Sequence, residues 1–319
     1  MKAALAIAFP GLLLSIPLWL DNAYLLHVLI VTGIFIVAAM SLNLLLGYAG
    51  QLSLGHVAFF GIGAYASALV SLGFKLTFPL EIEIQAKPVW LAMLVGMVAA
   101  GASGWLIGRI AFKVRGAYFV IVSISFAEVV RLVAVNWLEL TQGPMALNNI
   151  PPLALGDFIF YKKPENYWLV LGVALACYIL IRRLVHSRAG RAMVALAENE
   201  PLATSVGIDV TRYLVLAAVV SAAMAGAAGA LYAHYVRIVD PDVFLFIYTV
   251  TMVIMVVTGG KGTLAGPVVG GLIFGLLPEG LRAAAIAPET QWIVYGVLMV
   301  LVVYFLPRGI VPALRRYIQ

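Results

Sequence analysis

Apolar stretches of about 20 residues recur along almost the whole chain, and they constrain the fold more than any other feature. A helix of about 20 apolar residues spans the hydrocarbon core of a bilayer. Backbone N–H and C=O groups cannot stay unbonded in lipid, so such a chain crosses the membrane as helices or as a closed barrel. The stretches lack the alternating pattern of barrel strands. The sequence therefore predicts an all-α, polytopic membrane protein.

The positions of these stretches predict about 8–10 transmembrane helices in a single transmembrane domain over residues 1–319. The predicted spans are 3–20, 24–46, 52–72, 88–108, 117–138, 167–185, 213–233, 246–258, 264–278 and 290–306. The first one lacks a small-residue cleavage site and is predicted to be a retained span. The eighth and ninth are short and flank a glycine-rich break at 259–267, so they are either two spans or the half-helices of a re-entrant segment.

Basic residues are distributed unevenly between the two sides that this topology defines. The loops on the side of the N-terminus hold Lys2, Arg109, Lys113, Arg115, Arg182, Arg183, Arg188, Arg191, Arg212, Arg308, Arg315 and Arg316. The opposite loops carry more acidic than basic residues. Lysine and arginine accumulate in cytoplasmic loops, so both termini are predicted to be cytoplasmic. The net charge of +6 then reflects topology and does not indicate a nucleic-acid partner.

Motifs for enzymatic chemistry are missing from the sequence. There is no phosphate-binding GxxxxGK[ST] loop, no HExxH motif and no G-x-S-x-G elbow. The single cysteine, Cys177, lies within an apolar stretch and offers no metal-ligand spacing. The sequence predicts no catalytic residue, no metal site and no cofactor bound by this chain.

Two ionisable residues, Glu128 and Arg131, lie clearly within a predicted span. Their spacing places them on one helix face, where a structural ion pair that faces the bundle interior is the favoured interpretation and a functional role is the alternative. A carrier coupled to protons or sodium would need more such residues. Lys261, beside the second break, is expected to extend toward the cytoplasmic headgroups.

The glycine-rich segment 47–65 predicts an interrupted helix. Gly47 and Gly50 allow a sharp turn, and Ser53 is expected to cap the next helix. The free N–H groups of such a helix start suit a carboxylate, although tight helix packing explains the glycines equally well. If this break and the one at 259–267 face each other across a cavity, the predicted substrate pathway is lined by Gly50, Ser53, Gly55, His56, Gly63 and Thr263.

Four ordered motifs resemble a known family. They are residues 41–56 (SLNLLLGYAGQLSLGH), residues 188–192 with 198–200 and 207–213, residues 225–235 with Pro241, and residues 259–263 with 266–267. Together they resemble the branched-chain amino acid permease family of bacterial ABC importers. Within this family, the sequence at 198–200 and 207–213 is similar to that of the M-type rather than the H-type subunit.

The resemblance implies a permease subunit in the bacterial cytoplasmic membrane that forms half of a translocation pathway. Its implied partners are a homologous second permease, two ATPase subunits that use ATP and Mg, and a periplasmic solute-binding protein. The implied solutes are branched-chain or other hydrophobic amino acids, with urea, short amides or small organic acids as alternatives. An ion-coupled secondary transporter or channel is the alternative of a different class.

The resemblance also identifies 186–212 as a cytoplasmic coupling loop that docks on an ATPase. A single amphipathic helix is expected from Ala192 to Val206. The implied docking residues are Arg188, Arg191, Glu198, Glu200, Ala203 and Gly207. The segment 200–207 keeps only the outline of the coupling motif usual in such permeases.

Overall fold

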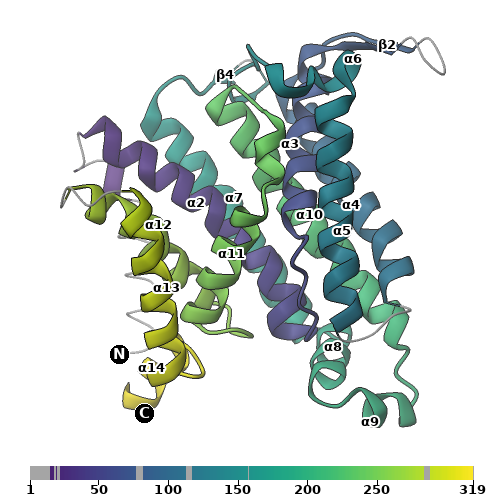
Figure 1. The fold of residues 1–319 in the computed structure, drawn as a ribbon, viewed down its shortest axis with the longest axis vertical. Coiled ribbons are helices and arrows are strands. Elements are labelled where there is room, and N and C mark those ends of the chain that lie inside the picture. The colour runs from purple at the N-terminus through teal and green to yellow at the C-terminus, as the bar shows by residue number, and fades with distance from the viewer. Residues whose placement is uncertain are drawn as a thin grey trace.

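The computed structural model describes residues 15–17, 19, 22–76, 82–112, 117–156, 158–283 and 288–318. Within these ranges the chain is a bundle of long helices, as predicted (Figure 1). Most of the predicted span 3–20 lies outside the described residues.

The predicted spans agree closely with the observed helices. The long helices are α2 (Ala23–Asn43), α3 (Val57–Leu72), α4 (Val89–Ala111), α5 (Ala117–Asn136), α7 (Lys163–His186), α10 (Val210–Val236), α11 (Phe246–Gly259), α12 (Gly266–Ala283) and α13 (Pro288–Phe305). Among the described helices, five are long and apolar enough to cross a bilayer, namely α2 with its extension to Tyr48, α4, α5, α7 and α10. Helices α3 and α11 are apolar but shorter.

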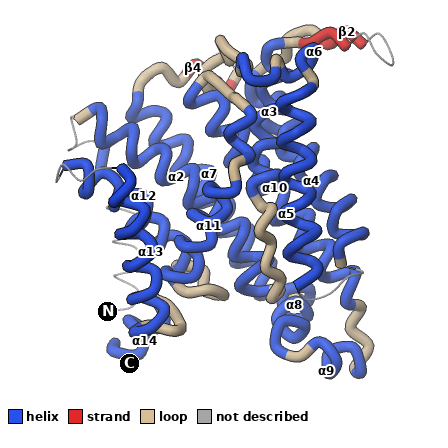
Figure 2. Tube along the Cα trace, in the orientation of Figure 1, coloured by secondary structure: helices blue, strands red, loops and turns tan. Residues whose placement is uncertain are grey.

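Short elements lie at the two ends of the bundle (Figure 2). One end carries the hairpins β1 (Phe74–Leu76) with β2 (Ile82–Ile84) and β3 (Ala154–Leu155) with β4 (Phe158–Ile159), and also α6 (Leu138–Thr141) and η2 (Gly143–Met145). The other end carries α8 (Arg188–Glu198), α9 (Glu200–Ser205) and α14 (Ile310–Ile318). The described loops that the sequence assigned to opposite sides of the membrane therefore lie at opposite ends of the bundle. After the orientation predicted from the sequence, we call these the outer and the cytoplasmic end.

Helices α3, α4 and α10 form the most tightly packed part of the bundle, because small residues let their backbones approach. A Cβ added to Gly63 would lie 2.2 Å from the carbonyl oxygen of Gly226, and one added to Gly96 would lie 2.5 Å from that of Gly63. A Cβ on Gly104 would similarly meet Ala222 at 2.5 Å. Small residues at helix crossings are the usual way in which membrane helices gain packing contacts without a hydrophobic driving force.

Helix α2 lies at the centre and packs against α7, α10, α11 and α12. The side chain of Asn22 caps its start by accepting hydrogen bonds from the N–H groups of Tyr24 and Leu25. At its cytoplasmic end it continues as a π-helical turn, η1 (Leu44–Tyr48), before the chain breaks at Gly50 with a positive φ of 69°. The predicted interruption of this helix is therefore present.

Helix α11 is short because it begins inside the bundle. Residues 237–245 leave the outer end of α10 as irregular chain with a 3-10 turn, η3 (Pro241–Phe244). Phe244 stacks on Tyr65 and touches Gly61 of α3, and the Thr249 hydroxyl accepts a hydrogen bond from the Val57 N–H at the start of α3. Residues 237–239 pair with the outer loop through Leu147, whereas residues 241–245 return into the bundle as irregular backbone. The sequence placed all of these residues in an outer loop.

The break at 259–267 lies at the cytoplasmic end. A Cβ on Gly260 would meet Pro312 of α14, and a Cβ on Gly309 would meet Gly260. From this break α12 returns toward the outer end, where Glu279 accepts a hydrogen bond from the Tyr24 hydroxyl at the start of α2. Helices α11 and α12 thus meet at this break and extend from it to different heights in the bundle.

Candidate functional site

The first turn of α3 is held by hydroxyl groups from two other helices. The N–H groups of Leu54 and Gly55 donate to Ser123 Oγ of α5 at 3.1 and 3.3 Å, and the N–H of Val57 donates to Thr249 Oγ1 of α11 at 3.1 Å. The expectation that Ser53 caps this helix is wrong, because helices distant in sequence supply the caps. Of the two alternatives left open for the glycines, tight packing is the one this conformation shows, since these hydroxyls occupy the N–H groups.

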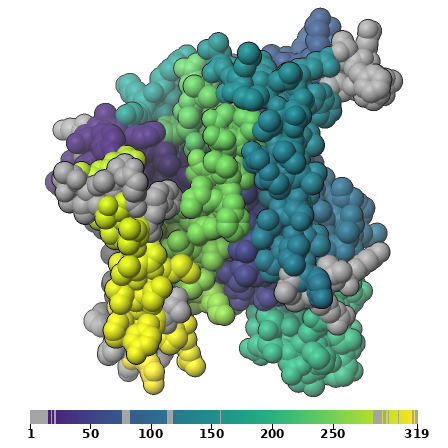
Figure 3. Space-filling view, in the orientation of Figure 1, coloured from purple at the N-terminus to yellow at the C-terminus, as the bar shows by residue number. Residues whose placement is uncertain are grey.

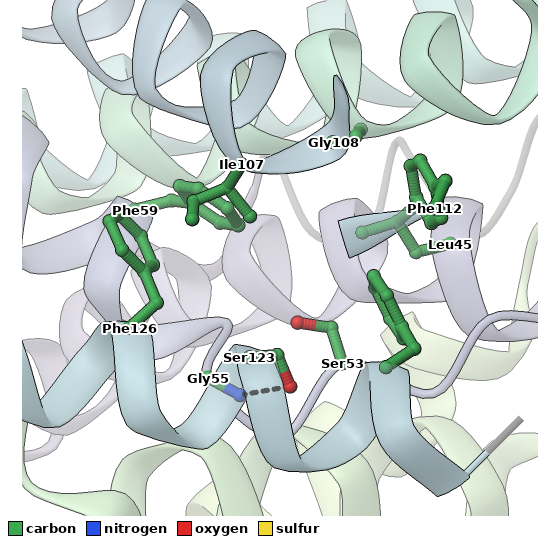
Figure 4. Close-up of a pocket in the computed structure, with 11 residues that line it drawn as sticks. Leu45, Ser53, Gly55, Phe59, Ile107, Gly108, Phe112, Ser123 and Phe126 are labelled. Carbon is green, nitrogen blue, oxygen red and sulfur yellow. Dashed lines mark hydrogen bonds between the residues drawn. The ribbon is translucent and has the colours of Figure 1, made fainter. Parts of the chain in front are cut away.

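A small cavity lies beside this turn (Figure 4). Ser53 and Ser123 contribute its hydroxyl groups, while aromatic rings, among them the stacked pair Phe112 and Phe119, close it on other sides. Its volume of about 10 Å³ is the room needed by one water molecule. Ser53 and Gly55 line this cavity, but it has no space for an amino acid.

His56 lies in the packed interior between α2, α3 and α10. It is fully buried, and its Nε2 is 2.7 Å from the Ser41 hydroxyl. The Ser41 hydroxyl donates to the carbonyl of Ala38, and the Ser221 hydroxyl of α10 donates to the carbonyl of Ser41. His56 therefore ties the start of α3 to α2, and Ser221 separately ties α10 to α2. His56 does not line the cavity that Ser53 and Gly55 share.

Gly63 lies where α3 crosses α4 and α10. The atoms nearest to a Cβ added at Gly63 are backbone atoms of Gly226. We expect Gly63→Ala to reduce the yield of folded protein strongly, because its methyl group would overlap the Gly226 carbonyl and force two helices apart. Gly172→Ala in α7 is the matched control, since a Cβ there meets nothing within 4 Å. Size-exclusion profiles and thermal melts of both variants in detergent check this. A wild-type melting temperature for Gly63→Ala would contradict the packing role.

Asn43 joins the two chain breaks at the cytoplasmic end. Its amide nitrogen donates to the carbonyl of Thr263 at 2.9 Å, and its amide oxygen accepts from the N–H of Gly262 at 2.9 Å. Gly47 makes the contact possible, because a Cβ there would lie 2.3 Å from the Gly262 nitrogen. The two breaks thus touch directly at Asn43, Gly47 and Gly262 in this conformation.

Thr263 serves the second break as a helix cap. Its hydroxyl donates to the carbonyl of Gly260 at 2.7 Å and accepts from the N–H of Gly266 at 3.0 Å, so it begins α12. Asn43 stands in the first of the four motifs, but it is not among the predicted site residues. A lone polar residue at the end of a long apolar span is the signal that could have identified it.

The first break also touches α8, the first helix of the cytoplasmic helix pair α8 and α9. A Cβ on Gly50 would lie 3.0 Å from the Cβ of Ala197 in α8, so the turn after η1 rests on this helix. Met193 and Leu196 on the same helix are buried in a cluster with Leu45 and Ala49. A movement of α8 would therefore displace the first break, and the hydrogen bonds of Asn43 would transmit the displacement to the second break.

The expected single amphipathic helix over 192–206 is wrong, because the chain forms α8 and α9 with a break at Asn199. The Asn199 side chain accepts a hydrogen bond from the Leu202 N–H and caps α9. Ala203 is buried against the bundle, whereas Leu202 and Val206 are 63% and 71% exposed. Helix α9 therefore presents apolar side chains at the cytoplasmic tip of the molecule (Figure 1).

The remaining predicted coupling residues surround this tip. Arg188 begins α8, and Arg191 donates to the carbonyl of His186 at 3.0 Å. Glu198 and Glu200 lie on the two sides of the break, and Gly207 ends the pair with a positive φ of 87°. The structure brings all of these residues into one cytoplasmic unit.

A second cavity, of about 340 Å³, opens at the outer end. It lies between the ends of α2, α7 and α10, and His27, Lys163, His234 and Arg237 are among its lining residues, which include no carboxylate. This size falls within the range of small-molecule pockets. The arrangement can hold a carboxylate or another anionic group. These residues come from three separate helices, so no local sequence pattern groups them.

These features define a class of protein. A bundle of apolar helices contains two chain breaks that are hydrogen-bonded to each other, and one of them rests on a protruding helix pair at the cytoplasmic end. This is the architecture of a multi-pass α-helical membrane protein. The chain belongs to the family described as branched-chain amino acid transport system / permease component, which matches residues 24–303. The predicted fold class and family are thereby confirmed.

Individual relatives agree with this assignment. The chain is 30% identical over 308 residues to the high-affinity branched-chain amino acid transport system permease protein LivM of Salmonella typhimurium, covering 89% of this chain and 69% of the relative. It is 30% identical over 285 residues to LivH of the same organism, covering 85% and 89%. It is 25% identical over 297 residues to BraD of Pseudomonas aeruginosa, covering 90% and 94%. No solved structure matches the chain significantly.

Proposed function

We propose that this chain is the permease subunit of an ATP-driven importer for branched-chain or other hydrophobic amino acids. Its partners are a homologous second permease, two cytoplasmic ATPase subunits that bind ATP and Mg, and a periplasmic solute-binding protein. The chain lies in the cytoplasmic membrane with both termini on the cytoplasmic side. The similarity to both LivM and LivH supports a pair of permeases, because the two relatives are different proteins of one organism.

The proposed mechanism rests on one observation, namely the series of contacts that leads from α8 through Gly50 to the two breaks. A rigid-body movement of the helix pair would shift the turn after η1, and the Asn43 bridge would pass this shift to α12. Access from the cytoplasm can change in this way without chemistry in the membrane. The chain thus needs no catalytic residue of its own.

We propose that the solute path lies on the lateral surface of this chain, at its contact with the second permease. The cavity beside α3 holds about one water molecule, so this conformation offers no route for an amino acid there. An amino acid crossing a low-dielectric barrier needs its carboxylate and ammonium groups shielded by polar groups. A path between two subunits can supply them from both chains.

Reconstitution tests this function. We expect the complex with the second permease and two ATPases to accumulate leucine in proteoliposomes only with ATP inside and binding protein outside, and the purified chain alone to be inactive. Transport by the chain alone, driven by an ion gradient or by the leucine gradient, would show a secondary transporter or channel instead. Competition by urea, acetamide and a small organic acid against labelled leucine distinguishes the possible solutes.

Gly207→Val is expected to uncouple ATP hydrolysis from uptake. Its backbone has a positive φ that costs a branched residue roughly 1–2 kcal/mol, so the end of α9 must change its path. Glu200→Gln, at the other end of α9, should weaken coupling by removing the charge from the first turn of this helix. The measurement is the ratio of leucine imported to ATP hydrolysed. Wild-type ratios in both variants would place the docking surface elsewhere.

A further inference from the structure

Glu128 and Arg131 form a two-point ion pair on an exposed face of α5. The expectation that this pair faces the bundle interior is therefore wrong within this chain. The Arg131 Nε lies 3.1 and 3.0 Å from the two carboxylate oxygens, and Nη2 lies 2.6 Å from Oε1. Their side chains are 52% and 27% exposed for Glu128 and Arg131. Glu128 lies roughly 12 Å along the helix from its end at Asn136, so it is near mid-membrane. An ion pair in contact with lipid at this depth is costly.

The exposed mid-span residues of other outer helices differ from those of α5. They are apolar, as expected for contact with lipid, and include Leu94, Val98, Trp105 and Leu106 on α4, Leu175, Ile179 and Leu180 on α7, and Val297, Val300 and Leu301 on α13. On α5 the exposed set also includes Ser125 beside the ion pair. The α5 face is thus unsuited to lipid, whereas the described faces of these neighbours suit it.

The irregular segment 237–245 lies directly beside this face. Its 3-10 turn packs against α5, and the two segments are adjacent on one surface of the molecule (Figure 3). Asp240 and Asp242 are exposed there, and Asp242 is close enough to Arg131 to attract it electrostatically. Irregular backbone at membrane depth is tolerated only where protein or a water-filled path covers it.

We infer that the second permease subunit covers this surface, which consists of the exposed face of α5 and residues 240–247. This inference rests on the proposed function and names the face on which the two permeases meet. A soluble ATPase or binding protein cannot reach a surface at this depth. The exposed apolar residues Leu245, Phe246 and Ile247 offer packing area to a membrane partner beside the charges. Charges of both signs on this surface also suit a path for a zwitterion.

Site-specific photo-crosslinking tests the inference in the assembled transporter. Val129 is 57% exposed and adjoins the ion pair, so Val129→benzoylphenylalanine places a probe on the surface without disturbing Glu128 or Arg131. Leu175→benzoylphenylalanine is the matched control, because Leu175 is 51% exposed on α7. We expect irradiation to give an adduct with the second permease from position 129 and none from position 175. Mass spectrometry of the adduct identifies the partner.

The possible outcomes separate the inference from the proposed function. An adduct that joins two copies of this chain through position 129 would support the inference and would show that the second permease is another copy of this chain. A complex that contains a second permease but yields adducts with it only from position 175 would overturn the inference alone. Failure of any second permease to co-purify with the wild-type chain would overturn the proposed function.

Discussion

Leu202→Asp is expected to abolish ATP-driven uptake while leaving the chain folded in the membrane. Leu202 projects from α9 at the cytoplasmic tip and is 63% exposed, so it makes few contacts within the chain. In the proposed complex it would be buried against an ATPase, where an unpaired carboxylate is strongly unfavourable. Central interface residues contribute roughly 2 kcal/mol or more, which is about 30-fold in affinity. Co-purification of the ATPase and leucine uptake in proteoliposomes measure the effect.

Leu155→Asp provides the control for this experiment. Leu155 is 64% exposed in β3 at the opposite end of the bundle, so the substitution adds the same charge at an equally exposed leucine. We expect the Leu155 variant to retain the ATPase. Equal retention of the ATPase by the Leu202 variant would show that α9 is not the docking element. Thermal melts of both variants should match the wild-type chain, because neither residue is part of the packed interior.

Asn43→Ala is expected to uncouple the two chain breaks and to reduce uptake at least about tenfold. The substitution removes both hydrogen bonds of the bridge and leaves the Gly262 N–H and the Thr263 carbonyl without these partners. Asn43 is 1% exposed, so water does not readily replace the amide. Losing two buried hydrogen bonds costs roughly 2–4 kcal/mol, which lowers the free energy of unfolding as well as the coupling.

Asn136→Ala is the matched control for the bridge. Asn136 also lies at the end of a span, but its side chain donates only to the carbonyl of Leu132 in its own helix and is exposed. We expect wild-type uptake and melting for this variant. If Asn43→Ala also showed wild-type uptake and melting, the bridge would have no role in coupling. A lower melting temperature with normal uptake would assign it to stability alone.

Much of the fold could be predicted from the sequence, because the length of an apolar stretch and the cost of unbonded backbone in lipid leave few alternatives. The break after Asn43 and the break at 259–267 were both predicted from glycine. Ser53 as the cap of α3 was a local prediction and was wrong. The hydroxyls that cap this helix come from Ser123 and Thr249, and no local pattern indicates which helices will be neighbours.

The sequence by itself thus determined that the chain is a helical membrane protein of this permease family, since hydropathy and ordered motifs are properties of the chain alone. Only the tertiary structure decided which polar groups meet. Asn43 and Gly262 are 219 residues apart, and their contact depends on the rotation and depth of α2 relative to α11 and α12. The depth of residues 237–245 was likewise decided by packing against α3 and α5. Hydropathy reports the solvent around a residue, whereas the bond it makes depends on which helix face lies opposite.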